Sequence, residues 1–442
     1  MHHINRLVWQ SAARVLLGIG LLGVLLASVG PLDFGAYSGC LATASIFGSA
    51  SCLGFDRVML IADPDECRVL RKLCILIALV LGAAAGTMCW LVFIKFAAGD
   101  MGRESIDATG QWVIAFNGFL QLTGTAAILC SSQLLIRERR FNLASLCLSL
   151  PSTIVLGAQV ISVRVLGSSV NALAIGAIAG WISILLVVFF WSMETGAGPS
   201  VPVRPVLQRW WKPAMVRMGT GIFSNGRTQL GYLVIFVSTP AGTELLAAIR
   251  LFDTAGSALS GVLERSWGTM LASIGCTESV ATFGVKSDAL IGEFARWIRK
   301  LAITCLLGLA VAAVVGRHFV PDQWSFIIKI APPILVAVAI AVQVAWLERL
   351  FEYQRRFKDG FWTEVVITLT LLTSYALLLP MTTSVYAGAW VFGGIYASMM
   401  MVRGYASMKR GVSRATSRGL LQTAATLALL AGLVVWVVQV LP

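Results

Sequence analysis

The chain has 442 residues, of which 57% are hydrophobic and only 12% are charged. A soluble protein of this length could not bury that much apolar surface, whereas a bilayer provides an apolar solvent. The formal net charge of +13 would suggest a nucleic-acid partner in a soluble protein. Most basic residues here fall in short loops between apolar segments, so the charge indicates membrane topology and no nucleic-acid partner.

Apolar segments of about twenty residues follow one another along the whole chain, and each is long enough to cross the hydrocarbon core as a helix. The predicted spans are 8–29, 36–61, 73–97, 111–134, 143–163, 168–192, 213–237, 242–263, 297–316, 327–348, 361–379, 384–402 and 419–441. We therefore predict an all-α polytopic membrane protein of about 13 transmembrane helices.

The loops between these spans differ sharply in charge. Arg6 and the loops that follow the even-numbered spans hold about 25 lysines and arginines, whereas the other loops hold about five. Because positive charge is retained on the cytoplasmic side, the N-terminus is predicted to be cytoplasmic. All loops are short, which disfavours an enzyme with a large outer substrate-binding domain.

A stretch rich in glycine and proline, 193–212, lies between the sixth and seventh spans on the predicted cytoplasmic side. We predict a six-helix lobe over 1–192, a cytoplasmic linker over 193–212, a second six-helix lobe over 213–402, and a basic loop with an extra helix over 403–442. Similar turns after the first and seventh spans, at Pro31 and Pro240, support an internal repeat. Such repeats are common in transporters, whose halves move about a central site.

Cysteines, histidines and glycines carry no catalytic motif. None of the nine cysteines lies in a predicted outward loop, so no disulfide is expected, and the three histidines are too scattered for a metal site. No cofactor is predicted. Three glycine patterns lie inside predicted spans and indicate close helix packing rather than nucleotide binding. They are Gly18/Gly20/Gly23, Gly82/Gly86 and Gly176/Gly180.

Arginines inside predicted spans are the most informative charges. Arg14, Arg227 and Arg250 each fall within a span, where an arginine must face a wet cavity or a partner. Asp253 follows Arg250 by one helical turn, so a self-contained ion pair is an alternative there. Arg217 lies close to the membrane surface and is expected to extend towards it. A cavity lined with arginines would suit an anionic substrate such as a phosphate.

Four side-chain amides also fall within predicted spans, two in the seventh span beside Arg227 and two in the fourth span. Asn225 and Gln229 flank Arg227, and Asn117 and Gln121 are one turn apart. They could bind sugar hydroxyls or form hydrogen bonds between helices, and the second interpretation is favoured.

Four segments of the chain form a recognisable pattern. They read Arg14-Val-Leu-Leu-Gly18, Gly30-Pro-Leu-Asp-Phe-Gly-Ala-Tyr37, Leu53-Gly-Phe-Asp-Arg57 and Arg137-Glu-Arg-Arg-Phe141. The second is a turn of the form G-P-x-D-F-G-x-Y between the first two spans, the third lies at the end of the second span, and the fourth is a basic segment after the fourth span. This pattern, most specific in the first sixty residues, resembles bacterial polysaccharide flippases (Wzx-like) of the multidrug/oligosaccharidyl-lipid/polysaccharide exporter superfamily. A thirteenth helix departs from the usual twelve or fourteen.

The resemblance implies two pseudo-symmetric six-helix lobes around a central cavity, with one extra C-terminal helix here. It implies a transporter of the bacterial inner membrane that flips a polyprenyl-diphosphate-linked oligosaccharide to the outer leaflet for surface polysaccharide synthesis. Polysaccharide polymerase and glycosyltransferases would then be partners. The implied substrate-binding arginines are Arg14, Arg57, Arg227 and Arg250, with Asp253, Asn225, Gln229, Asn117 and Gln121 as supporting polar residues.

Two other functions remain open. A multidrug or toxin exporter of the same superfamily would be expected to have an acidic cavity, but buried acid is limited to Asp253 and Glu364. A membrane polysaccharide polymerase or ligase would share the hydropathy, but generally has a large outward loop. A lipid II flippase is a close relative of the leading hypothesis that the sequence does not separate from it.

Overall fold

The computed structural model describes residues 17–18, 20–59, 62–98, 108–137, 141–193, 202–238, 242–254, 322–345 and 357–408, with residues 347 and 351 and short stretches within 288–307 and 419–433. Every regular element in these ranges is a helix, which confirms the all-α prediction. Predicted spans 297–316 and 419–441 lie largely outside the described residues. The chain divides into two compact units, one spanning Leu16–Leu233 and the other holding the described residues from Val234 onward.

Six described helices are long and apolar enough to cross a membrane. Their membrane-compatible segments are Asp65–Ile94, Gly110–Leu135, Val170–Val188, Phe326–Val344, Lys358–Met381 and Val385–Met408. These match six of the predicted spans within a few residues, except that the first begins eight residues early and the last ends six residues late. The match follows from hydropathy alone, because a helix in lipid must pair its own backbone groups.

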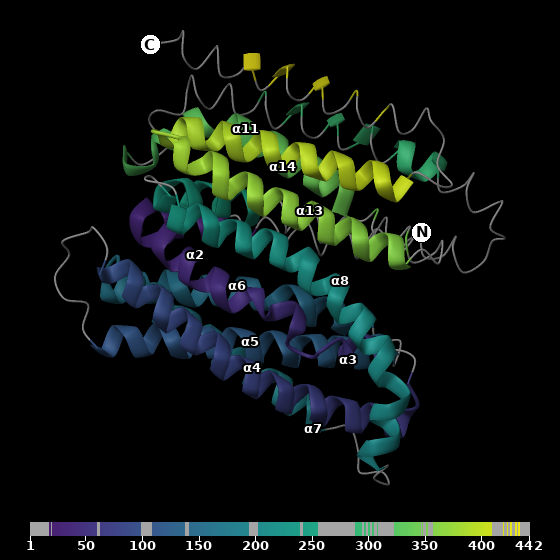
Figure 1. The fold of residues 1–442 in the computed structure, drawn as a ribbon. Helices are drawn as coiled ribbons and strands as arrows, with labels where there is room; N and C mark the ends of the chain where they lie inside the picture. Colours follow the sequence, from purple (N-terminus) through teal and green to yellow (C-terminus); the bar gives the residue numbers. More distant parts are fainter. Residues whose placement is uncertain are drawn as a thin grey trace. The chain divides into compact units, whose positions relative to one another are not determined.

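The first unit is built from α2 (Pro31–Ile46), α3 (Phe55–Val58), α4 (Pro64–Ala98), α5 (Ala108–Arg137), α6 (Phe141–Leu166) and α7 (Val170–Met193), and α8 (Val203–Ser238) crosses into the second. Helix α5 packs on α2, α4, α6 and α7, so it lies at the centre of this unit (Figure 1). In the second unit, α14 (Val385–Met408) packs on α11 (Phe326–Ala345) and α13 (Phe357–Leu378).

Glycines explain two of the close contacts in the first unit. A Cβ atom on Gly176 would lie 2.5 Å from the Gln159 Cα atom, and one on Gly86 would lie 2.7 Å from the Ala115 carbonyl oxygen. Close packing was therefore correctly predicted for the two G-x-x-x-G patterns. The pattern in the first span differs, because added Cβ atoms on its glycines would meet no described atom within 4 Å.

The predicted second span, 36–61, is not one continuous helix. It begins earlier, at Pro31, ends at Ile46, and is followed by a 3-10 turn and a bend before α3. Gly54 makes the bend with φ of +76°, a conformation that glycine adopts without strain. A Cβ atom here would lie 2.3 Å from the carbonyl oxygen of Ala214 on α8, so the glycine of the Leu53–Arg57 motif also allows close backbone contact.

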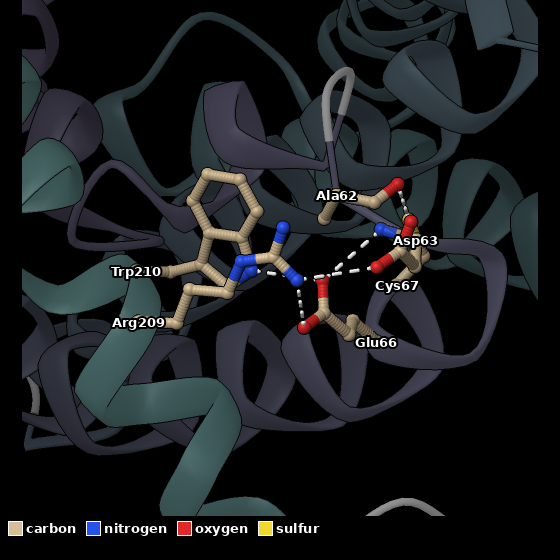
Figure 2. Close-up of polar contacts among 6 residues, drawn as sticks. All are labelled: Ala62, Asp63, Glu66, Cys67, Arg209 and Trp210. Carbon is tan, nitrogen blue, oxygen red and sulfur yellow. Dashed lines mark hydrogen bonds and ion pairs between the residues drawn. The ribbon is translucent and has the colours of Figure 1, made fainter.

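Helix α8 starts within the predicted linker, because residues 203–212 form its first turns. Figure 2 shows how this extension is attached to the start of α4. Arg209 contacts Asp63 and Glu66 at 3.2 and 3.1 Å, and the indole nitrogen of Trp210 donates a 2.9 Å hydrogen bond to Glu66. Glu66 also accepts from the Asp63 backbone N–H, as in a capping box. From the sequence, Arg209 was assigned only to a basic cytoplasmic loop. In the structure it also links α8 to the start of α4.

Candidate functional site

Helix α8 carries three of the predicted site residues within five positions. Arg227 is buried, with 5% of its surface exposed, and Asn225 and Gln229 are partly buried. Asn225 and Gln229 are four residues apart and share a face of the helix. Since each residue advances about 100°, Arg227 lies about 200° round from Asn225 and projects from the other side. The three side chains therefore do not lie on one face of α8.

Ser45, in the last turn of α2, joins α8 to α5. Its backbone oxygen accepts a 2.6 Å hydrogen bond from the amide nitrogen of Asn225, and its hydroxyl oxygen accepts a 2.8 Å bond from Gln121. Carbonyl groups in the last turn of a helix lack their regular intrahelical donor, so a side-chain donor is favourable there. The structure thus brings Asn225 and Gln121, which are far apart in sequence, to the same residue.

Tyr37, the last residue of the G-P-x-D-F-G-x-Y motif, is a second residue that links helices through hydrogen bonds. Its hydroxyl accepts a 3.4 Å hydrogen bond from Asn117 on α5 and a 2.8 Å bond from Gln159 on α6. Gln159 also donates to the Leu173 backbone oxygen on α7 at 3.2 Å. Asn117, Gln121 and Asn225 therefore form the interhelical hydrogen bonds that the favoured interpretation predicted.

Three amide oxygens of this region are buried and accept no hydrogen bond from the described protein atoms. They are Oδ1 of Asn117, Oε1 of Gln121 and Oε1 of Gln229. A buried carbonyl oxygen without a donor costs about 1–3 kcal/mol. Such atoms are suited to accept hydrogen bonds from hydroxyl groups of a ligand. We call the hydrogen-bonded residues Tyr37, Ser45, Asn117, Gln121, Gln159 and Asn225 the amide network.

Of the other predicted arginines, two have side chains outside the described residues and the third belongs to the other unit. Arg14 lies outside the described residues, as does the side chain of Arg57, although its backbone belongs to α3. Arg250 and Asp253 are partly exposed on a helix over 242–254 in the other unit. A shared arginine cavity therefore stays a prediction.

One charge assignment from the sequence is wrong. Arg403 was counted among the cytoplasmic loop residues and was placed at the start of the 403–442 segment, but it lies inside α14 and is buried. Its Nε atom donates to Oε1 of Glu364 on α13, which is also buried. The hydropathy pattern hid this pair because Arg403 lies close to the end of its apolar segment. Arg403 and Glu364 thus neutralise each other inside the second unit.

Sequence reasoning missed Ser45 and Gln159, and it used Tyr37 only as part of a motif. Gln159 could have been found, because a glutamine in the middle of an apolar span needs a partner. Ser45 could not, because its bonds depend on where α2 ends.

No protein-family model matches the chain, and no curated protein matches it. Solved structures do, at low identity and over almost the full length. The inward closed conformation of the lipid II flippase MurJ has a TM-score of 0.66 at 12% identity, covering 99% of this chain and 98% of that one. An outward-facing multidrug resistance MATE family transporter of the MOP superfamily has a TM-score of 0.58 at 13% identity, covering 97% of each chain.

A third solved structure is a MOP superfamily transporter from Pyrococcus furiosus, described as having a binding pocket of reversed polarity that suggests a different function. It has a TM-score of 0.53 at 12% identity and covers 97% of this chain and 96% of that one. At these identities the likeness concerns the fold. The chain therefore has the fold of MOP superfamily transporters, as its first sixty residues predicted.

Proposed function

We propose that this protein flips a polyprenyl-diphosphate-linked oligosaccharide from the cytoplasmic to the outer leaflet of a bacterial inner membrane. The observation that carries the proposal is the position of Arg227, a buried arginine on α8 two residues along the chain from Asn225 of the amide network. The predicted span 213–237 places Arg227 near the centre of a membrane helix, where an arginine costs about 2.5–3.5 kcal/mol on insertion scales, and this cost supports a functional role.

Arg227 and the buried amide oxygens of this region match the two halves of such a substrate. A diphosphate carries about two negative charges, and exposing it to hydrocarbon would be prohibitive. A guanidinium group binds phosphate through two parallel hydrogen bonds and can replace part of its lost hydration. The buried amide oxygens of Asn117, Gln121 and Gln229 accept hydrogen bonds, which sugar hydroxyls can donate.

Arg14, Arg57 and Arg250 are proposed as further contacts to the phosphates, with Asp253 as a supporting residue. With the cell interior negative, outward movement of an anion is favoured by roughly 2.3 kcal/mol per charge per 100 mV. The membrane potential can therefore assist export. The proposed partners are the polymerase and the glycosyltransferases of surface polysaccharide synthesis. The N-terminus is proposed to lie in the cytoplasm.

Export of cationic drugs is the second candidate, favoured by the fold shared with a multidrug resistance transporter. Such a site would need a buried acid. Among the described residues the buried carboxylates are Asp56 and Glu364, and Glu364 is already bonded to Arg403. The charge sign of the buried residues on α8 therefore favours the anionic substrate.

The two candidates are separated by transport in vesicles that contain the purified protein. A fluorescent polyprenyl-diphosphate oligosaccharide is followed by its accessibility to a membrane-impermeant reductant, and ethidium is followed by efflux. We expect faster leaflet exchange of the diphosphate lipid than in protein-free vesicles, with no ethidium transport. Ethidium efflux without exchange of the lipid would overturn the proposal.

A further inference from the structure

Three cysteines from separate segments meet in the core of the first unit. Cys52 lies in the turn after α2, Cys74 on α4 and Cys130 on α5, and all three are at most 2% exposed. Their sulfur atoms all lie within 4.8 Å of one another, and those of Cys52 and Cys130 are 3.7 Å apart. We call these residues the cysteine triad. The sequence predicted no metal site because its three histidines are scattered, and it considered the cysteines only for disulfides.

We propose that the cysteine triad binds a thiophilic d10 metal ion, either Cu(I) or Zn(II). Thiolate sulfur is the ligand these ions prefer. A Zn–S bond of about 2.3 Å places tetrahedral sulfur ligands about 3.8 Å apart, which matches the Cys52–Cys130 separation. The remaining sulfur atoms, no more than 4.8 Å apart, need a shift of about 1 Å to reach the same spacing. The ligands are therefore already close to a binding arrangement.

Charged groups near the triad fit a bound cation better than a purely apolar core. Arg71 and Asp56 both act electrostatically on Cys130, and Asp56 is itself buried. Binding releases the thiol protons and leaves thiolates around the metal. Arg71 then offsets the surplus negative charge of the thiolates, and a zinc ion would take its fourth ligand from outside the triad. Copper(I) needs none, because three sulfurs suffice in a trigonal site.

Two other interpretations of the triad predict different chemistry. Buried cysteines also pack as small apolar residues, and Phe55, Leu70 and Ala126 belong to the same core cluster. Alternatively, Cys52 and Cys130 could join as a disulfide, although thiols stay reduced on the predicted cytoplasmic side. Packing predicts no metal binding, and a disulfide predicts the loss of two thiols.

A bound ion would connect the turn at Cys52 to α4 and α5. This turn continues through Gly54 into α3, whose backbone carries Arg57. The ion would therefore hold the segment that positions Arg57, whichever substrate the protein moves. The site is independent of the proposed function, since its test measures bound metal.

The test uses the full-length protein, purified in detergent under reducing conditions, loaded separately with Cu(I) and Zn(II) and then desalted. We expect a single ion of one metal per chain, measured by elemental analysis, and sulfur neighbours in its X-ray absorption spectrum. The variant in which Cys52, Cys74 and Cys130 are all serine should retain none. Cys89→Ser/Cys147→Ser, which changes two buried cysteines outside the triad, should retain the ion.

The spectrum of the unmodified protein keeps the proposal falsifiable even if the serine variant does not fold. Three sulfur neighbours in the copper sample identify a trigonal copper site, and three sulfurs with one oxygen or nitrogen neighbour in the zinc sample identify a zinc site. Failure to retain either ion would overturn the proposal. So would equal retention by the folded serine variant, or a Cys52–Cys130 disulfide found by mass spectrometry in the reduced preparation.

Discussion

The buried pair Arg403–Glu364 gives the sharpest prediction about stability. Both side chains are at most 4% exposed, and a direct hydrogen bond links them. Replacing one member leaves the other charge buried without its partner, which costs about 3–5 kcal/mol. We therefore expect Arg403→Met and Glu364→Gln each to destabilise the protein by about this amount.

Replacing both members should behave differently. In the double variant Arg403→Met/Glu364→Leu, no charge remains to be desolvated, and apolar side chains of similar volume fill the space. Such replacements are often neutral or stabilising by about 1–4 kcal/mol. The double variant should therefore be at least several kcal/mol more stable than expected from the sum of the two single costs. This difference would be a strong energetic coupling between two residues in contact.

The assay is unfolding in mixed micelles with increasing sodium dodecyl sulfate, followed by tryptophan fluorescence. Arg68→Met serves as the matched control, because it breaks an ion pair with Asp65 in which the two side chains are 43% and 46% exposed. Exposed pairs contribute about 0–1 kcal/mol, so this control should change stability little. Single variants as mild as the control, or additive costs in the double variant, would refute the reasoning.

Three further predictions address the backbone, the second unit and the topology. Gly54→Ala should destabilise the protein by more than about 1 kcal/mol in the same unfolding assay, because both its positive φ and the contact with α8 disfavour a Cβ atom; wild-type stability would contradict this. If Arg250 binds phosphate, Arg250→Ala/Asp253→Ala should transport no better than Arg250→Ala, whereas recovery of transport would show that Arg250 only neutralises Asp253. Cysteine labelling in intact cells should find 193–212 on the cytoplasmic side and 98–110 outside, and labelling of both from one side would contradict the span assignments.

Hydropathy predicted the helices well because lipid leaves the backbone few alternatives. The break between α2 and α3 was missed, because apolar residues continue on both sides of it. The residue that could have indicated the break is Gly54. Glycine is also common in helices that pack closely, so Gly54 did not by itself indicate a bend. The early start of α8 was missed because Arg204 and Arg209 lower hydropathy, which measures insertion into lipid and not helix formation.

The site was predicted by residue type and only partly by position. The sequence correctly selected Asn117, Gln121 and Asn225 as polar side chains that bond between helices. It could not find Ser45 as their shared partner, because this depends on tertiary packing. The cysteine triad was out of reach for the same reason, since its members lie on three separate segments.

The proposed function depends most directly on Arg227. The central measurement is leaflet exchange of a fluorescent polyprenyl-diphosphate oligosaccharide in vesicles containing Arg227→Ala, Arg227→Lys or the control Arg204→Ala. Arg204 is exposed in the first turn of the same helix, so its loss should leave exchange unchanged. Losing hydrogen bonds to a charged group costs about 1.5–3 kcal/mol, which corresponds to a decrease of roughly 10- to 150-fold.

We predict a decrease of this size in Arg227→Ala, with normal insertion and the wild-type elution volume on size exclusion. Arg227→Lys should recover exchange in part, because lysine keeps the charge but loses the planar arrangement of donors. Wild-type exchange by a correctly inserted Arg227→Ala protein would contradict the account.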